Sequence, residues 1–286
     1  MKLLIAGAFG NLGSDLLRAA VQMGHDVTAV DMVIRDIEGL DAKRFVAKKV
    51  DITKKESLAG LCEGMDAVIT TVGLTKTSAT LTNYDIDYKG NKNLLDEAVR
   101  AKVKKFVYIS VLKADAREDV PMLHAKYLME QEIKKSKICY VIHRPTGYFY
   151  DIANVFMPMI EKGKVTLLGK KPVHANVIDT SDFATFILQH LNDNNVTYDV
   201  GGKETYSYEE MAKLFFEAAG KPVKISHAPT WLFDVLAQVN KWKKNGKEAI
   251  IKFSKWTLSN EMVGNTTYGT HSFKEYVKSR YQSENR

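Results

Sequence analysis

The chain has 286 residues, of which 45% are apolar and 26% charged, a composition typical of a globular protein with a substantial core. Its 41 basic and 34 acidic residues give a net charge of +7, but the basic residues occur singly or in pairs, which excludes a basic nucleic-acid-binding arm. Its two cysteines, Cys62 and Cys139, form no CxxC motif and no His/Cys cluster, so the sequence predicts neither a disulfide framework nor a metal site.

An apolar strand over residues 2–6 runs into Gly7, Gly10 and Gly13 and continues into a helix over 11–23. In such a unit Gly7 permits a tight turn, Gly10 lets backbone N–H groups approach a pyrophosphate, and Gly13 allows the helix to pack closely on the strand. The helix N-terminus adds unpaired N–H groups and a partial positive charge, so this turn is predicted to bind a dinucleotide. The other turn residues expected to contact the cofactor are Phe9, Asn11 and Leu12.

The second strand, over 27–30, ends at Asp31. A carboxylate there can accept hydrogen bonds from both hydroxyls of the adenosine ribose and would repel the 2′-phosphate of NADP. Arg35 follows closely, and it can either reach a 2′-phosphate or be an ordinary loop residue. The expected cofactor is therefore NAD or NADP, with NAD favoured by Asp31.

The third strand, over 45–50, precedes Asp51 and Ile52. Asp51 can bind the adenine amino group while Ile52 packs on the ring, or it can cap a helix predicted over 54–62. Both interpretations stay open, and both residues are included in the expected cofactor site.

The fourth strand, over 67–71, ends in the small-residue turn Thr71-Val72-Gly73. The backbone of such a turn can pass close to a ribose and a phosphate, so these three residues are expected to contact the cofactor. Residues 75–77 follow and are expected in a loop near the nicotinamide.

Two further strands, over 105–109 and 139–143, alternate with helices over 84–101 and 122–136. Together the six strands predict a doubly wound parallel sheet of the α/β class, whose ligands bind beyond the carboxyl ends of the strands. Ser110 lies at one such end. Its hydroxyl can hydrogen-bond a substrate carbonyl or the nicotinamide carboxamide, or it can cap the backbone.

After Pro145, itself expected near the cofactor, the alternation gives way to short strands, turns and helices. The predicted domains are a Rossmann domain over 1–150 and a small α+β substrate lobe over 151–286, which covers the cleft and does not fold independently. Tyr148 either lines the substrate cleft or packs beneath this lobe. The lobe's predicted helices are 153–161, 180–191, 207–219 and 231–243.

The helix over 231–243 has apolar residues at helical spacing, interrupted by Asp234, Gln238 and Lys241, so it is amphipathic and not a membrane span. Since no signal peptide is visible, we expect a cytoplasmic protein without a membrane partner. The tryptophans expected to be buried in the lobe are Trp231, Trp242 and Trp256.

Three further motifs accompany the glycine turn in the first half of the chain. They are Tyr84-Asp85-Ile86-Asp87-Tyr88-Lys89-Gly90-Asn91-Lys92-Asn93-Leu94-Leu95, Val103-Lys104-Lys105-Phe106-Val107-Tyr108-Ile109-Ser110 and Arg144-Pro145-Thr146-Gly147-Tyr148-Phe149. In this order they resemble the extended and atypical short-chain dehydrogenase/reductases.

The C-terminal motifs are similar to the NmrA-like branch of that superfamily, in particular to its divinyl chlorophyllide reductase-like members. They include Val173-His174-Ala175-Asn176-Val177-Ile178-Asp179-Thr180-Ser181-Asp182 and Tyr198-Asp199-Val200-Gly201-Gly202. The resemblance implies an NAD(P)-binding Rossmann fold, while the branch is too mixed in function to name a substrate. Within these motifs Asp179 and Asp182 are expected to cap helices or form salt bridges.

The same resemblance implies a Tyr-x-x-x-Lys pair, in which the lysine binds the nicotinamide ribose and the phenol transfers a proton. Lys126 stands at the lysine position, but Met122 occupies the tyrosine position, and a thioether cannot relay a proton. Tyr127 projects about 100° away from Lys126 around the helix, and His124 also projects elsewhere. The candidate catalytic residues are therefore Lys126, Ser110 and Tyr148.

Three classes of function fit these residues. The first is an oxidoreductase that passes hydride between a nicotinamide and a small or flat organic substrate without the usual tyrosine. The second is a dinucleotide-sensing regulator that acts through a protein partner, since no helix-turn-helix or basic arm for nucleic acid is evident. The third is a structural subunit of a redox assembly.

Overall fold

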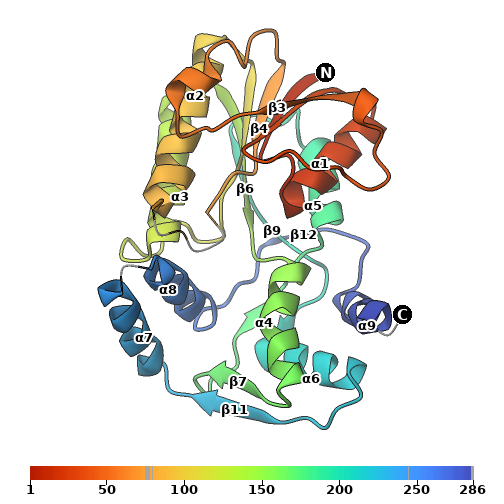
Figure 1. The fold of residues 1–286 in the computed structure, drawn as a ribbon, viewed down its shortest axis with the longest axis vertical. Helices are drawn as coiled ribbons and strands as arrows, with labels where there is room; N and C mark the ends of the chain where they lie inside the picture. Colours follow the sequence, from red (N-terminus) through yellow and green to blue (C-terminus); the bar gives the residue numbers. More distant parts are fainter. Residues whose placement is uncertain (75–77, 79, 244, 285–286) are drawn as a thin grey trace. The chain divides into compact units, whose positions relative to one another are not determined.

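The computed structural model describes residues 1–74, 78, 80–243 and 245–284, and the chain divides into two compact units (Figure 1). Unit 1 consists of Met1–Arg144 and Phe183–Tyr198, and unit 2 of Pro145–Asp182 and Asp199–Arg286. Residues 183–198 thus belong with the N-terminal part of the chain, whereas the predicted ranges 1–150 and 151–286 had placed them in the C-terminal lobe.

The sheet is parallel at its centre, as the alternating pattern predicted. Strands β1 (Lys2–Ala6), β2 (Asp26–Asp31), β3 (Phe45–Lys49), β4 (Ala67–Thr70), β5 (Lys105–Ile109) and β6 (Cys139–Pro145) lie in the order β6-β5-β4-β1-β2-β3. Beyond β6 the order continues with β9 (Val196–Gly201) and β12 (Thr266–Thr267), which were not predicted. The doubly wound α/β fold is confirmed.

Helices cover both faces of this sheet (Figure 1). On one face, α2 (Asn91–Arg100) and α3 (Pro121–Lys135) bury a core in which Leu94 and Met129 meet Leu4, Val68 and Phe106 of the strands. On the other face lie α1 (Asn11–Gln22) and α5 (Thr180–Gln189). The apolar stripe of α1, with Leu12, Leu16 and Ala20 among its buried residues, fixes the helix directly behind the glycine turn.

Two predicted helices differ in the structure. The segment expected to be helical over 54–62 forms only a short 3₁₀-helix, η2 (Lys55–Leu58), because Gly60 and Gly64 adopt left-handed φ values of 73° and 72° and the chain turns there. The segment predicted as a helix over 84–101 begins as a π-helix, η3 (Tyr84–Gly90), before α2 continues it. A further 3₁₀-helix, η1 (Ala42–Arg44), precedes β3.

His143 of β6 ties residues 183–198 to unit 1. Its ring is fully buried and stacks on Tyr198 at 5.8 Å, while Phe183 and Phe186 meet it edge-on at 5.9 and 5.6 Å. Within the described residues neither ring nitrogen has a hydrogen-bond partner. Burial therefore lowers the pKa of His143 to about 3, and the ring is neutral.

Unit 2 combines helices with two small sheets, as expected for an α+β lobe. Its helices are α4 (Phe149–Glu161), α6 (Tyr208–Ala218), α7 (Trp231–Trp242), α8 (Lys247–Thr257) and α9 (Phe273–Glu284). Strand β7 (Val165–Leu168) pairs in parallel with β11 (Ile225–Ala228), and β8 (His174–Ala175) pairs antiparallel with β10 (Tyr206–Ser207). Among the described residues, no helix combines the length and apolar character needed to cross a membrane.

Candidate functional site

The strand register brings three predicted residues to one level at the carboxyl edge of the sheet. Ala6 of β1 pairs with Val30 of β2 on one side and with Thr70 of β4 on the other. The next residue of each strand is therefore Gly7, Asp31 or Thr71. Because the strand order reverses direction at β1, this edge is the topological switch point where doubly wound sheets bind ligands.

The glycine turn is built so that a side chain at Gly7 or Gly13 would collide with its surroundings. Gly7 has a φ of 77°, and a Cβ on it would lie 2.6 Å from Oγ1 of Thr71, which donates hydrogen bonds to the carbonyls of Ala6 (3.2 Å) and Gly7 (3.1 Å). A Cβ on Gly13 would lie 1.9 Å from the carbonyl oxygen of Gly7. The roles predicted for these two glycines, a tight turn and close packing, are confirmed.

Gly10 differs, because a Cβ there would meet only the Gly7 carbonyl, at 3.4 Å. Gly10 and Asn11 are exposed, while Phe9 and Leu12 are buried beside them. Gly10 is the N-cap of α1, and the Ser14 N–H donates to its carbonyl at 2.9 Å. The N–H groups of the first helical turn have no acceptor within the helix, so this surface presents donors suited to an anion.

Asp31 is held against the same turn. One carboxylate oxygen accepts the Phe9 N–H at 3.1 Å, and the other accepts the Met32 N–H at 2.7 Å. These bonds fix the direction of the carboxylate, while each oxygen keeps a lone pair for a further donor. The side chain of Arg35 is exposed.

Asp51 forms a local turn but does not cap the helix predicted over 54–62, because η2 has Lys54 as its N-cap without a side-chain hydrogen bond. Oδ1 of Asp51 accepts the Thr53 N–H at 3.0 Å and the Thr53 hydroxyl at 2.6 Å, and the Lys54 N–H donates to the Asp51 carbonyl. Ile52 is buried. The carboxylate thus stabilises the turn into η2, whereas contacts of Asp51 and Ile52 with an adenine ring stay a prediction.

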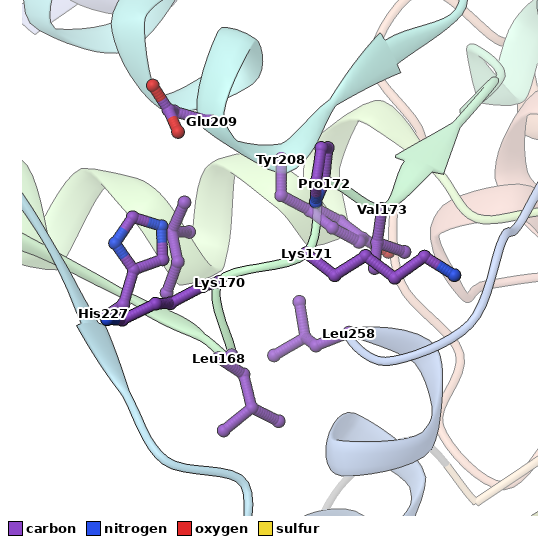
Figure 2. A pocket seen from close by; sticks show the side chains of 11 residues that line it. Leu168, Lys170, Lys171, Pro172, Val173, Tyr208, Glu209, His227 and Leu258 are labelled. Carbon is purple, nitrogen blue, oxygen red and sulfur yellow. The ribbon is translucent and has the colours of Figure 1, made fainter.

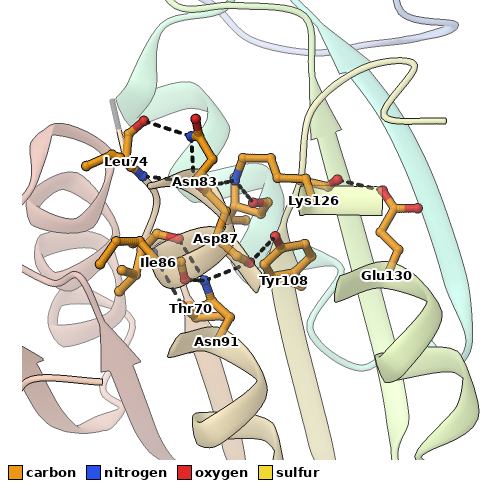
Figure 3. A network of polar contacts seen from close by, with 12 residues as sticks. Thr70, Leu74, Asn83, Ile86, Asp87, Asn91, Tyr108, Lys126 and Glu130 are labelled. Carbon is orange, nitrogen blue, oxygen red and sulfur yellow. Dashed lines mark hydrogen bonds and ion pairs between the residues drawn. The ribbon is translucent and has the colours of Figure 1, made fainter. Parts of the chain in front are cut away.

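Lys126 of α3 is fixed by a buried ion pair that the sequence did not indicate (Figure 3). Its Nζ lies 3.1 Å from Oδ1 of Asp87 in η3, and the two side chains are 12% and 1% exposed. Nζ also donates to the Ile109 carbonyl at 3.1 Å and lies 5.4 Å from the centre of the Tyr108 ring. An ammonium group has three donors, so one remains for a ligand.

The other carboxylate oxygen of Asp87 is held by hydrogen bonds. This oxygen, Oδ2, accepts the Asn83 side-chain amide at 2.9 Å and the Leu74 N–H at 3.2 Å (Figure 3). A Cβ on Gly73 would lie 2.8 Å from Oδ1 of Asp87 and 3.3 Å from Nζ of Lys126. The small-residue turn after β4 is therefore required by the ion pair, in addition to any cofactor contact of Thr71, Val72 and Gly73.

Asn91, the first residue of α2, also supports this network. Its side-chain amide donates to the carbonyls of Val72, Ile86 and Asp87, and its oxygen accepts the Thr70 hydroxyl at 2.7 Å. Each buried polar atom of Asn91 is thereby satisfied, which fixes the start of α2 against the end of β4.

Ser110 lies at the end of β5 as predicted, but its hydroxyl donates to Glu130 at 2.5 Å. Glu130 is fully buried and also binds Arg144, whose Nε and Nη2 lie 2.8 and 2.6 Å from its two oxygens. The Ser110 proton therefore points to Glu130 of α3. A contact of Ser110 with substrate or carboxamide stays a prediction, and in this geometry the hydroxyl would act as an acceptor.

Met122, which stands at the position of the missing tyrosine, is buried. A different phenol lies close by in the fold: the hydroxyl of Tyr84 in η3 is 3.0 Å from Nδ1 of His124 in α3. The same two elements carry Asp87 and Lys126, so the two polar pairs are neighbours along one helix contact. The sequence does not indicate a role for Tyr84, because nothing in the spacing links it to a histidine in a distant segment.

Pro145 and Tyr148 begin unit 2. Pro145 is buried, and Tyr148 stacks on Tyr150 with ring centres 5.5 Å apart. Burial raises the pKa of Tyr148 well above its ordinary value, so its phenol stays protonated at neutral pH. Its place in a substrate cleft stays a prediction.

Asp179 and Asp182 have the structural roles expected of them. Asp179 accepts the Ser181 N–H at 2.9 Å near the start of α5. Asp182 accepts the N–H groups of Thr270 and His271, both at 2.9 Å, and so anchors the segment before α9.

Unit 2 also contains a small cavity of about 50 Å³ between β7, β11 and α6 (Figure 2). Lys170, Lys171 and His227 contribute polar groups to it, and Leu168 and Leu258 contribute apolar walls. This volume is far below the several hundred Å³ of a typical cofactor site. Residues 75–77, expected near the nicotinamide, lie outside the described residues.

Comparison with known proteins agrees with this geometry. The model of the NmrA-like family matches residues 1–268. Photosystem II assembly factor Ycf39 of Cyanophora paradoxa is 27% identical over 235 residues, which cover 80% of this chain and 72% of that protein. Divinyl chlorophyllide a 8-vinyl-reductase of Arabidopsis thaliana is 24% identical over 270 residues, or 84% and 62% of the two chains.

Among solved structures, Citrobacter sp. triphenylmethane reductase complexed with NADP(H) has a TM-score of 0.72 at 18% identity, covering 98% of this chain and 99% of that one. At this identity the likeness shows the fold alone. The family match extends from the glycine turn almost to α9, and the chain therefore belongs to the NmrA-like family.

Proposed function

We propose that unit 1 binds a nicotinamide dinucleotide across the carboxyl ends of β1, β2 and β4. The observation that carries this proposal is the alignment of Gly7, Asp31 and Thr71 by the strand register, with the first turn of α1 beside them. Triphenylmethane reductase, which has the same fold, is complexed with NADP(H).

The residues present fit such a ligand. The exposed backbone at Gly10 and Asn11 leaves room and N–H donors for the pyrophosphate, and the fixed carboxylate of Asp31 suits the ribose hydroxyls. Lys126 directs its remaining N–H toward the nicotinamide ribose in this arrangement, while Asp87 holds its ammonium group in place.

NAD is the preferred cofactor in this proposal, because the Asp31 carboxylate would repel a 2′-phosphate. Calorimetric titration of the protein with NADH and, separately, with NADPH tests this preference for NAD over NADP. We expect tighter binding of NADH, and Asp31→Ser should narrow or reverse the difference. Tighter binding of NADPH by the unaltered protein would show that the Asp31 carboxylate does not exclude a 2′-phosphate and that Arg35 or another group receives it.

The proposed reaction is transfer of hydride to a small or flat organic acceptor, with a reduced nicotinamide supplying the hydride. The protein positions the reactants, and Lys126 places a positive charge beside the reacting centre. Because Met122 cannot donate a proton, the Tyr84 hydroxyl, oriented by His124, is the proposed proton donor.

Kinetic measurements separate these roles. Lys126→Met should weaken dinucleotide binding, whereas Tyr84→Phe should leave binding within about twofold and lower turnover by about 10²-fold, the usual size of a general-acid effect. NADH and NADPH oxidation should be followed with a panel of quinones, conjugated alkenes and dyes. No turnover with any acceptor, despite measurable dinucleotide binding, would exclude the oxidoreductase.

A second candidate function is favoured by Met122 and by the likeness to an assembly factor. In this alternative the protein senses a bound dinucleotide and acts through a protein partner. Affinity capture with and without NADH distinguishes it, since a sensor should hold a partner whose affinity depends on the dinucleotide.

A further inference from the structure

Helix α7 turns its apolar side away from the protein. Its exposed large side chains form one stripe and range from 38% to 80% exposed; they are Trp231, Leu232, Val235, Leu236, Val239 and Trp242. We call these six residues the α7 stripe. The prediction that Trp231 and Trp242 are buried in the lobe is wrong, whereas Trp256 of α8 is buried as predicted.

The side of α7 that faces α8 is mixed in character, because Phe233 and the buried Ala237 lie on it beside polar residues. Asp234, Gln238 and Lys241 line a groove together with charged residues of α8, and Lys255 binds both carboxylate oxygens of Asp234 at 2.6 and 2.7 Å. At about 100° per residue, the centre of the α7 stripe lies roughly opposite this groove. An amphipathic helix normally packs its apolar stripe inward, so the exposed α7 stripe is an apolar surface available to another partner.

The charge around the stripe is positive. The two acidic residues of α7 and α8 are both ion-paired within the helix pair: Asp234 with Lys255, and Glu248 with Lys252 at 2.8 Å. The remaining lysines at the end of α7 and the start of α8 include the exposed Lys241, Lys243 and Lys247. This excess of positive charge complements an anionic surface, and it would repel the same surface of a second copy.

The composition of the stripe suits the interface of a lipid bilayer. Indole rings stand at both ends of it, and tryptophan concentrates at the level of the lipid headgroups. Valine and leucine between them provide moderate hydrophobicity, and the helix is too short to span. Such a helix lies in the plane of the interface, with its lysines among the headgroups.

We propose that α7 docks the protein on membranes that carry anionic lipids. The α7 stripe enters the interfacial layer, Lys243 and Lys247 at the α7–α8 connection contact the headgroups, and Lys241 on the groove side adds attraction at longer range. Membrane docking would contradict the expectation from the sequence that the protein has no membrane partner. The proposal does not depend on the proposed dinucleotide chemistry.

Sedimentation with vesicles tests the proposal on the full chain. We expect binding to phosphatidylcholine vesicles that contain phosphatidylglycerol, with a blue shift of tryptophan emission, and much weaker binding to phosphatidylcholine alone. Val235→Gln with Trp242→Gln should lower the partition coefficient at least about tenfold, because two apolar side chains no longer enter the bilayer. A triple variant should lower the ratio of binding to anionic over neutral vesicles at least about tenfold; its changes are Lys241→Gln, Lys243→Gln and Lys247→Gln.

The controls change exposed apolar residues and exposed lysines elsewhere in unit 2. Val155→Gln with Val223→Gln alters two exposed valines, and the corresponding lysine control is Lys162→Gln, Lys164→Gln and Lys224→Gln. Circular dichroism melting should show that all variants fold. Failure of the unaltered protein to bind anionic vesicles, or equal losses in variants and controls, would overturn the proposal. A dimer in sedimentation equilibrium that the stripe substitutions abolish would assign the stripe to a protein partner instead.

Discussion

At the residue scale, two glycines of the turn have different roles: packing of the fold requires Gly13, whereas cofactor binding is expected to require Gly10. A Cβ on Gly13 would lie 1.9 Å from the Gly7 carbonyl, whereas a Cβ on Gly10 has no contact closer than 3.4 Å. Gly13→Ala should therefore destabilise the protein strongly, while Gly10→Ala should melt within a few degrees of the unaltered protein but bind NADH more weakly.

Thermal melting and NADH titration of the two variants check this prediction. If Gly10→Ala bound NADH as tightly as the unaltered protein, the backbone at Gly10 would not approach the pyrophosphate. If Gly13→Ala melted normally, α1 would have to shift away from the turn.

The Asp87–Lys126 ion pair makes a second prediction at this scale. Asp87→Asn leaves a buried ammonium group without its counter-charge and should cost about 3–5 kcal/mol of unfolding free energy. Combining it with Lys126→Met should cost less than the sum of the single changes, because neither charge then remains alone. Urea unfolding of the four proteins measures the coupling, and strictly additive losses would contradict it.

Some residues of the site could be predicted and others could not, for a physical reason. Gly7, Gly13 and Asp31 follow from the order of strand, turn and helix, which is local in the sequence. Asp87, Tyr84 and Glu130 bind partners in other segments of the chain, and a periodic sequence pattern does not indicate such pairings. Met122 was identified only because the resemblance defines what should stand there.

At the element scale, helix position was predicted better than helix type. The apolar repeat placed α1 and α3 well, but it could not show that η3 would be a π-helix or that η2 would end so early. Gly90 at the end of η3 packs closely, since a Cβ there would lie 3.0 Å from Ile52. Glycines in the left-handed conformation end η2 early.

The buried His143, where β6 contacts α5, leads to a prediction about how the stability of the fold depends on pH. His143 is neutral in the folded protein because burial lowers its pKa to about 3 from 6.5, whereas in the unfolded chain it accepts a proton near pH 6.5. Acid therefore favours the unfolded chain, and the His143 contribution to stability falls progressively as the pH drops from 6.5 toward 3.

His143→Phe should remove this dependence. It should also stabilise the protein at pH 7 by about 1–3 kcal/mol, since two buried ring nitrogens without partners are replaced by carbon. Urea unfolding at pH 7 and pH 5 measures both effects, with the exposed His227→Gln as control. An unchanged acid sensitivity in His143→Phe would show that other groups cause it.

At the scale of the whole molecule, unit 1 is not continuous in the chain. A fragment of residues 1–150 lacks β9 and α5, which supply the ring contacts of His143 from Phe183, Phe186 and Tyr198. We expect this fragment to melt without a cooperative transition in circular dichroism, while the full chain melts cooperatively. A fragment with a sharp transition near that of the full chain would show that residues 183–198 are dispensable.

The same discontinuity orders events during synthesis. As the chain leaves the ribosome, β6 is complete at residue 145, but the strand beside it in the sheet is not made until residue 201, and β12 follows only at residue 267. Until then β6 is an open edge, with unpaired backbone groups that attract other strands. Residues 145–182 therefore emerge while unit 1 is unfinished, and protection of the β6 edge by a chaperone matters most in that interval.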